Sequence, residues 1–156
     1  MSDFDIAIIG SGPGGYVCAI RAAQLGLSVC CVEKSETLGG TCLNVGCIPS
    51  KSLLHTSYLF KQTKDLNQIG ISVSDVQIDI KKMIKSKNES VTGLTDGIKF
   101  LFKKNKIIHK KGFGRIINSN EIEVLSDNNS EIIKAKNIVI ATGSEVSTPK
   151  DILLDE

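Results

Sequence analysis

A glycine-rich turn near the start of the chain constrains the fold more than any other feature. Residues 10–15 read GSGPGG; they follow an apolar run at residues 4–9 and precede helix-forming residues 16–25. Gly26 then stands where a left-handed helix cap requires glycine, and a second apolar run follows at residues 28–33. This order of strand, turn, helix and strand predicts a βαβ unit with parallel strands, and hence an α/β fold.

The spacing of the glycines adds a chemical prediction. Gly10, Gly12 and Gly15 match the dinucleotide fingerprint, which needs glycine for a tight turn, for close approach to a pyrophosphate and for packing of helix on strand. The following helix would point its free N–H groups at the phosphates. Glu33 ends the second strand, 18 residues after Gly15, and suits the hydroxyls of an adenosine ribose while repelling a 2′-phosphate. The alternative is a plain glycine-rich turn, and the residues alone leave FAD and NAD open.

The rest of the chain predicts one domain without repeats or internal boundaries. We expect a loop at residues 34–40, a helix at residues 41–64 interrupted near Gly46 and Pro49, and a second helix over residues 76–105. Short β segments should follow, at residues 107–113, 114–117, 121–125, 131–135 and 138–141, with turns at residues 118–120 and 126–129. The predicted fold is a parallel sheet plus a small antiparallel β-meander.

Two of the five cysteines stand apart from the apolar segments. The other three, Cys18, Cys30 and Cys31, fit ordinary burial, and the set lacks the framework of a secreted domain, so we expect a reducing compartment. Cys42 and Cys47 are five residues apart. In a regular helix their Cα atoms would be about 8.7 Å apart, beyond the roughly 7 Å limit for a disulfide. A disulfide here therefore demands a distorted turn.

Three interpretations of this cysteine pair are open. A zinc half-site would need a second ligand pair, and only His55 and His109 are left, neither at a usual spacing. Two buried, inert thiols are the second possibility. The third is a redox-active dithiol near a helix start, where the helix dipole favours the thiolate. No metal is expected.

The charge pattern excludes some classes of function. The net charge is +2, but residues 61–115 hold 13 Lys and Arg against 5 Asp and Glu. We interpret this segment as a solvated, Lys-rich helical face, because it lacks the interleaved aromatics and motifs of a nucleic-acid-binding protein. No window approaches the roughly 18 apolar residues that a membrane-spanning helix needs. Only three residues precede Phe4, so we expect a bacterial cytoplasmic location, although a processed mitochondrial chain would look the same.

Residues 39–51 carry a family resemblance. Their sequence, GGTCLNVGCIPSK, resembles the active-site segment of the class I pyridine nucleotide-disulfide oxidoreductases. Residues 10–16, 22–26, 33–34 and 141–144 fit the same family in the same order. The resemblance implies FAD in this first fold, Cys42 as the interchange thiol and Cys47 as the thiolate stacked on the flavin. It implies cofactor binding by Gly10, Gly12, Pro13, Gly14, Gly15, Glu33, Lys34, Gly40, Thr41, Lys51, Gly114, Ala141, Thr142 and Gly143.

Individual roles also follow from the resemblance. The glycine turn would hold the pyrophosphate, Glu33 the adenosine ribose, and backbone near Gly114 the adenine end. Thr41 and Lys51 would lie around the flavin, and a fixed positive charge there would stabilise a reduced, anionic flavin. Lys51 could instead be an exposed helix cation. Neither histidine matches the family's catalytic base, so we expect both to be structural or solvated.

Within the family, the wording of the segment is closest to the branch that oxidises dihydrolipoyl groups. In that branch electrons pass through the disulfide and FAD to NAD, lipoyl domains of 2-oxo acid dehydrogenase complexes or of the glycine cleavage system are the partners, and the enzyme is a homodimer. Mercuric or glutathione reductase, and a non-catalytic FAD-binding fragment, are the alternatives. Family members are longer, so we expect residues 1–150 to be an incomplete FAD domain and residues 151–156 to begin a connection. The NAD site would lie outside this chain, and this portion alone should not turn over.

Overall fold

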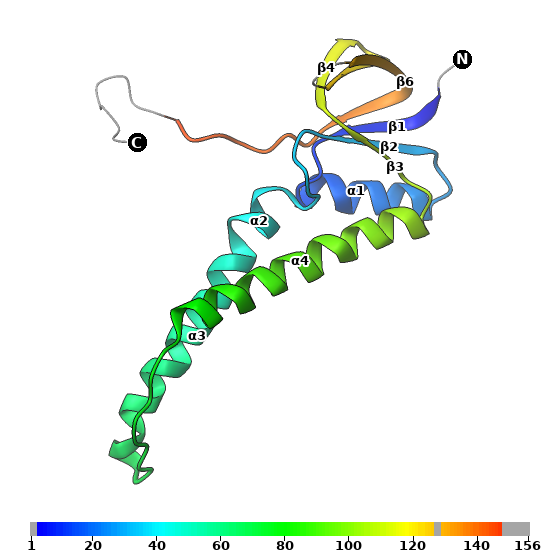
Figure 1. Cartoon of the computed structure of the whole chain (residues 1–156). Coiled ribbons are helices and arrows are strands. Elements are labelled where there is room, and N and C mark those ends of the chain that lie inside the picture. Colours follow the sequence, from blue (N-terminus) through cyan, green and yellow to red (C-terminus); the bar gives the residue numbers. More distant parts are fainter. Residues whose placement is uncertain (1–2, 127–128, 148–156) are drawn as a thin grey trace.

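The computed structural model describes residues 3–126 and 129–147 (Figure 1). The chain begins with a strand, a helix and a strand, continues through consecutive helices and ends in consecutive strands. The elements are β1 (Phe4–Ile9), α1 (Pro13–Gln24), β2 (Val29–Glu33), α2 (Gly40–Asn44), α3 (Cys47–Asp65), the 3-10 helix η1 (Leu66–Ile69), α4 (Ile80–Lys104), β3 (Ile108–Lys111), β4 (Phe113–Asn118), β5 (Glu121–Ser126) and β6 (Asn129–Ile140).

The strands form a six-stranded sheet in the order β3-β2-β1-β6-β5-β4. β1 pairs in parallel with β2 and β6, and β2 pairs in parallel with β3. β4, β5 and the first half of β6 form an antiparallel meander. The predicted α/β fold with a parallel sheet and an antiparallel meander is therefore confirmed.

Side chains of β2 alternate between two hydrophobic cores. All five residues of the strand are buried, which is expected of a central strand covered on both faces. Cys31 belongs to the core beneath α1 and α4, whereas its neighbour Cys30 belongs to the core beneath the meander. The period of two along a strand therefore places adjacent cysteines on opposite faces, and both are fully buried, as predicted.

Helices α3 and α4 form a long arm that extends away from the sheet (Figure 1). The C-terminal part of α4 returns to the sheet, where Ile98 and Phe102 are buried in the core with α1. Many apolar side chains of the arm are exposed, Leu54 and Ile84 among them. No helix in the described ranges is long and apolar enough to cross a membrane.

Three predicted boundaries are wrong. The last helix begins at Ile80 rather than at residue 76, because the Asp79 side chain caps it by accepting a hydrogen bond of 3.0 Å from the Lys82 N–H. The first helix already begins at Pro13, within the glycine turn. The two predicted strands at residues 131–135 and 138–141 are one strand, because β6 passes from its pairing with β5 to its pairing with β1 across the polar residues Lys136 and Asn137.

Candidate functional site

The glycine turn between β1 and α1 is closed to larger side chains. Gly10 has φ +99°, and a Cβ built there would lie 2.3 Å from the Ala141 carbonyl oxygen. A Cβ on Gly15 would lie 1.8 Å from the Gly10 oxygen. Because real Cβ atoms do not approach other atoms so closely, both positions require glycine. The close packing that the fingerprint predicts is present.

The first turn of α1 faces outward from this turn. Pro13 occupies the first helical position, and no side chain in the described part of the chain caps the helix at Gly12. A Cβ on Gly14 would meet nothing within 4 Å. An uncapped helix N-terminus with open space beside it favours an anionic ligand, because its free N–H groups and the positive end of the helix dipole point outward. These residues fit a pyrophosphate.

Glu33 is held by neutral donors at the end of β2. Its Oε2 accepts hydrogen bonds from the Ser11 N–H at 2.8 Å and from the Ser11 hydroxyl at 2.6 Å, and its Oε1 accepts one from the Ser35 N–H at 2.8 Å. Glu33 is 7% exposed and Ser11 is fully buried. Burial alone would raise the pKa of Glu33, but the hydrogen bonds from both serines outweigh it and hold the pKa below its ordinary value. Glu33 is therefore ionised at neutral pH.

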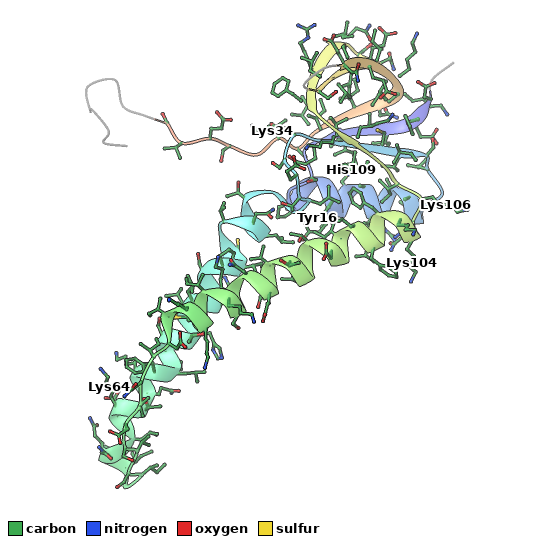
Figure 2. All side chains as sticks on the ribbon, viewed as in Figure 1. Tyr16, Lys34, Lys64, Lys104, Lys106 and His109 are labelled. Atoms are coloured by element: carbon green, nitrogen blue, oxygen red, sulfur yellow. The ribbon has the colours of Figure 1, made fainter. Side chains whose placement is uncertain are left out.

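The other residues predicted at this end of the sheet fall into two groups. Ala141 bonds to Ile9 through its N–H at 2.8 Å, and Gly114 packs so closely over β1 that a Cβ there would lie 2.9 Å from the Ile9 side chain. These two line the same sheet end as Gly10. Lys34 lies further out, on the exposed loop after β2 (Figure 2), in a 3.4 Å ion pair with the exposed Glu145. Two further predicted residues, Thr142 and Gly143, are exposed as well.

The cysteine pair spans a break between two helices. Cys42 lies in α2, and Cys47 is the first residue of α3. Between them Gly46 has φ −107° and ψ −109°, outside helical values, and its N–H donates to the Thr41 oxygen at 2.7 Å. The helix is thus interrupted at Gly46, as predicted. Pro49 does not interrupt it, because the first turn of a helix tolerates proline.

The two thiols of the pair are neighbours and both are free. The hydrogen bond with Cys47 and then partial desolvation raise the pKa of Cys42, while the positive charge of Lys51 acts in the opposite direction. Cys47 and Lys51 are exposed on α3. Burial raises the pKa of Cys30 and of Cys31 to about 12, which makes these two thiols inert. The accessible, interacting pair is therefore Cys42 with Cys47.

The cysteine segment touches the glycine turn directly. The Gly39 N–H donates to the Ser11 oxygen at 2.9 Å. Gly40 has φ +58°, and a Cβ there would lie 2.6 Å from the Gly12 Cα. The loop before α2 thus packs backbone against backbone on the turn. A dinucleotide held at the turn would lie next to the dithiol segment.

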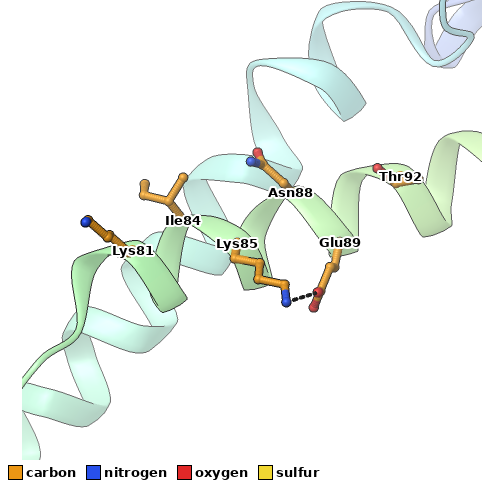
Figure 3. A pocket seen from close by; sticks show the side chains of 6 residues that line it. All are labelled: Lys81, Ile84, Lys85, Asn88, Glu89 and Thr92. Atoms are coloured by element: carbon orange, nitrogen blue, oxygen red, sulfur yellow. Dashed lines mark ion pairs between the residues drawn. The ribbon is translucent and has the colours of Figure 1, made fainter.

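Other features of the surface are remote from this site. A hollow of about 520 Å³ lies along one face of α4 (Figure 3) and is lined by Lys81, Ile84, Lys85, Asn88, Glu89 and Thr92. It is open to solvent, and a 3.8 Å ion pair joins Lys85 to Glu89 within it. The described residues contain no cluster of three or more His, Cys, Asp or Glu side chains that could hold a metal ion. The zinc interpretation of the cysteines therefore gains no support.

The Lys-rich segment and the histidines are solvated, as predicted. Lys64 lies on the arm, and Lys104 and Lys106 lie where α4 ends (Figure 2). All three are exposed, as are His55 and His109. Partial desolvation of the imidazole lowers the pKa of His109 although Glu33 acts in the opposite direction, so this histidine is neutral at neutral pH.

Sequence reasoning missed two residues of the site. Ser11 occupies a variable position of the glycine fingerprint, yet it supplies both donors to Glu33 Oε2. Asn44 lies between the cysteines and makes three side-chain hydrogen bonds, two with the preceding loop and one with Gly40 at the start of α2. A signal for Asn44 was available, because asparagine within a short helix commonly bonds to nearby backbone instead.

Comparison with known proteins agrees with this geometry. The chain belongs to the pyridine nucleotide-disulphide oxidoreductase family, whose model matches residues 4–153. It is 52% identical to mitochondrial dihydrolipoyl dehydrogenase of Mesocricetus auratus, over 99% of this chain and 33% of the relative. The human enzyme of the same name is 50% identical, over 99% of this chain and 31% of the relative. The family resemblance of residues 39–51 is confirmed.

A solved structure shares the fold as well. The HOCl-induced flavoprotein disulfide reductase RclA of Escherichia coli, in a Cu(II) complex, superposes with a TM-score of 0.80 at 28% identity. The match covers 96% of this chain and 31% of that protein. This chain therefore spans about a third of the length of the relatives it matches.

Proposed function

We propose that the chain is the N-terminal part of an FAD-binding domain whose dithiol, in the complete enzyme, oxidises dihydrolipoyl groups. Residues 1–150 would form this part, and residues 151–156 would lead into further domains. Residues 148–156 lie outside the described residues. About 50% identity to proteins named dihydrolipoyl dehydrogenase supports this branch over mercuric or glutathione reductase. FAD, when bound, supplies a two-electron acceptor for the dithiol.

The residues at the sheet end would each contribute to holding FAD. The uncapped N-terminus of α1 would bind the pyrophosphate, and Glu33, ionised and already oriented, would accept hydrogen bonds from the ribose hydroxyls. Gly40 and Thr41 would let the cofactor pass beside the cysteine pair. The adenine end would lie against the backbone near Gly114.

The exchange step balances within the two thiol pairs. One dihydrolipoyl thiolate would attack the Cys42 sulfur of the Cys42–Cys47 disulfide, form a mixed disulfide and release the Cys47 thiolate. The second dihydrolipoyl thiol would then attack the substrate sulfur of the mixed disulfide and release Cys42. The substrate loses two electrons and two protons and becomes the cyclic disulfide, and the two cysteines gain them.

The helix positions support this order of events. Cys47 starts the 19-residue helix α3, whose dipole stabilises a thiolate leaving at that position. Cys42 has a raised pKa, so it is protonated after its release. In the complete enzyme NAD would be the final acceptor, at a site outside this chain.

One observation carries the proposal: an interacting pair of accessible thiols flanks a helix break, and the loop that leads into this segment packs against a dinucleotide turn. The test begins with oxidised chain, which has three free thiols left of five if one disulfide has formed. Dihydrolipoamide should restore two thiols per chain. Cys42→Ser should gain none, and the matched variant Cys18→Ser, outside the pair, should gain two like the wild type.

The branch assignment needs a separate assay with the complete enzyme. Dihydrolipoamide should reduce NAD, whereas reduction of glutathione disulfide by NADPH without activity on dihydrolipoamide would overturn the assignment. The chain alone should not reduce NAD catalytically, and measurable turnover would contradict its proposed status as a part. We further propose that the complete enzyme is a homodimer whose partners are lipoyl domains. Its location would be the bacterial cytoplasm or the mitochondrion. The mitochondrial names of the relatives favour the second location.

A further inference from the structure

A single amide side chain clamps the loop that leads into the cysteine segment. The Asn44 Nδ2 donates to the Leu38 oxygen at 3.2 Å and to the Gly40 oxygen at 2.8 Å. Its Oδ1 accepts a hydrogen bond from the Thr37 hydroxyl at 2.7 Å. Both N–H bonds of the amide and one lone pair are therefore used within residues 37–40.

The helix that carries Cys42 needs support from side chains. α2 is only five residues long, and helices of this length do not hold themselves. Its N-cap, Gly39, has φ +103° and contributes no side chain. The bond from the Leu43 N–H to the Gly39 oxygen is long, at 3.4 Å. At its other end, the N–H groups of Val45 and Gly46 donate to the Thr41 oxygen at 3.0 and 2.7 Å. The direction of Cys42 therefore depends on these bonds, on the burial of Leu43 and on the three bonds of Asn44.

The clamped loop is also the segment that packs on the glycine turn. Gly39 bonds to Ser11, and Gly40 leaves no room for a side chain against Gly12. A shift of the loop would therefore be resisted on one side by the turn and on the other by Asn44. The amide thus ties the end of α2 to the loop, and Gly39 in that loop bonds to the turn.

We propose that Asn44 is a positioning residue that sets the geometry of the Cys42–Cys47 pair for thiol–disulfide exchange, acting through the backbone of residues 37–40. The inference rests on the proposed dithiol function. Since the closing of a disulfide depends on how often its two sulfurs meet, loss of the clamp should lower the stability of the disulfide relative to the dithiol.

The test is the equilibrium of the chain with glutathione at neutral pH. Two glutathione thiols reduce the disulfide to two cysteine thiols and become glutathione disulfide, so electrons and protons balance. Asn44→Ala deletes all three bonds and should shift the equilibrium towards the dithiol by about tenfold or more. Asn44→Ser, whose hydroxyl can still bond to the Gly40 oxygen, should shift it less and is the variant to use if the alanine variant fails to fold.

Thr37→Val is the matched control, because it removes one bond to Asn44 and leaves the bonds from Asn44 to the Leu38 and Gly40 oxygens in place. Its shift should stay within about threefold. The unfolding free energy of the oxidised and the reduced forms should be measured in parallel. A merely structural role would lower both equally and leave the glutathione equilibrium unchanged.

The outcomes separate the inference from the function on which it rests. A wild-type disulfide together with shifts in the Asn44→Ala and Asn44→Ser variants supports the positioning role. A wild-type disulfide with unshifted, folded Asn44 variants overturns the role and leaves the proposed function intact. A wild-type chain that forms no Cys42–Cys47 disulfide at any glutathione ratio overturns both.

Discussion

The two ends of the β1–β2 pair use the same hydrogen-bond pattern in different surroundings. At one end Ser28 donates its N–H and hydroxyl to one oxygen of Asp5, at 2.9 and 2.7 Å; at the other Ser11 donates both to one oxygen of Glu33, at 2.8 and 2.6 Å. Asp5 is partly exposed and pairs with Lys136, whereas Glu33 is buried and has no ion pair in the described part of the chain. At the first end, the hydrogen bonds join the two strands at the surface, and we call this the surface clip. At the second end, they hold a buried carboxylate that can still accept hydrogen bonds from a ligand.

The difference lies in what stabilises each charge. The hydrogen bond from Lys136 and then those from Ser28 lower the pKa of Asp5. Burial opposes ionisation of Glu33, and only neutral donors overcome it. Because both folded-state pKa values lie below those of the unfolded chain, both groups stabilise the fold above the ordinary carboxyl pKa. This stabilisation is lost as the pH falls through each folded-state value.

Substitutions in the glycine turn, at the Glu33 end of the strand pair, should change the unfolding free energy most. Gly15→Ala places a Cβ 1.8 Å from the Gly10 oxygen, so we expect the unfolding free energy to fall by about 3 kcal/mol or the chain not to fold. Gly14→Ala is the matched control, because its Cβ meets nothing. It should leave the unfolding free energy within about 1 kcal/mol in denaturant melts. Equal losses in both variants would contradict close packing at the turn.

Replacing each carboxylate by its neutral isostere should give the next largest effect, and the loss of unfolding free energy should differ between the two ends. Glu33→Gln removes the charge and presents an NH₂ group to an N–H or hydroxyl donor. We therefore expect a loss of about 1–3 kcal/mol in unfolding free energy at pH 7. Asp5→Asn should cost clearly less, because water reaches that group. The same denaturant melts measure both, and a costlier Asp5 variant would show that the surface clip, rather than the buried carboxylate, holds the strand pair.

Added salt should have the smallest effect, and it should change the carboxyl pKa only at the Asp5 end of the strand pair. A salt concentration of 1 M reduces the screening length to about 3 Å. The carboxyl pKa of Asp5, followed by carbon NMR, should rise towards its ordinary value as the pairing with Lys136 weakens. The pKa of Glu33 should stay in place because its donors, Ser11 and Ser35, are neutral. A comparable rise at Glu33 would reveal an ionic partner for that carboxylate.

The sequence predicted the turn and the cysteine pair because their chemistry dictates residue type at fixed spacing. Gly10 and Gly15 are required by contacts with the chain's own backbone, so the fingerprint identifies them without a ligand. The break at Gly46 followed from the distance limit on a disulfide, which a regular helix between Cys42 and Cys47 cannot meet.

Other features depend on contacts that no local pattern encodes. Ser11 acquires its role only when β2 places Glu33 beside it, 22 positions along the chain. The continuity of β6 depends on its pairing with both β5 and β1, which overrides the polar residues at its centre. The start of α4 was set by the Asp79 cap rather than by the apolar pattern, which extends further towards the N-terminus.

Titration of the chain with FAD, followed by flavin absorbance and fluorescence, tests the central claim most directly. The wild-type chain should bind FAD, Glu33→Gln should weaken binding by about tenfold or more because a charge-assisted hydrogen bond to the ribose is lost, and Asp5→Asn should leave it within about twofold. Equal affinities of the wild type and the Glu33 variant, or an equal loss in the Asp5 variant, would contradict the assignment of this sheet end as the cofactor site.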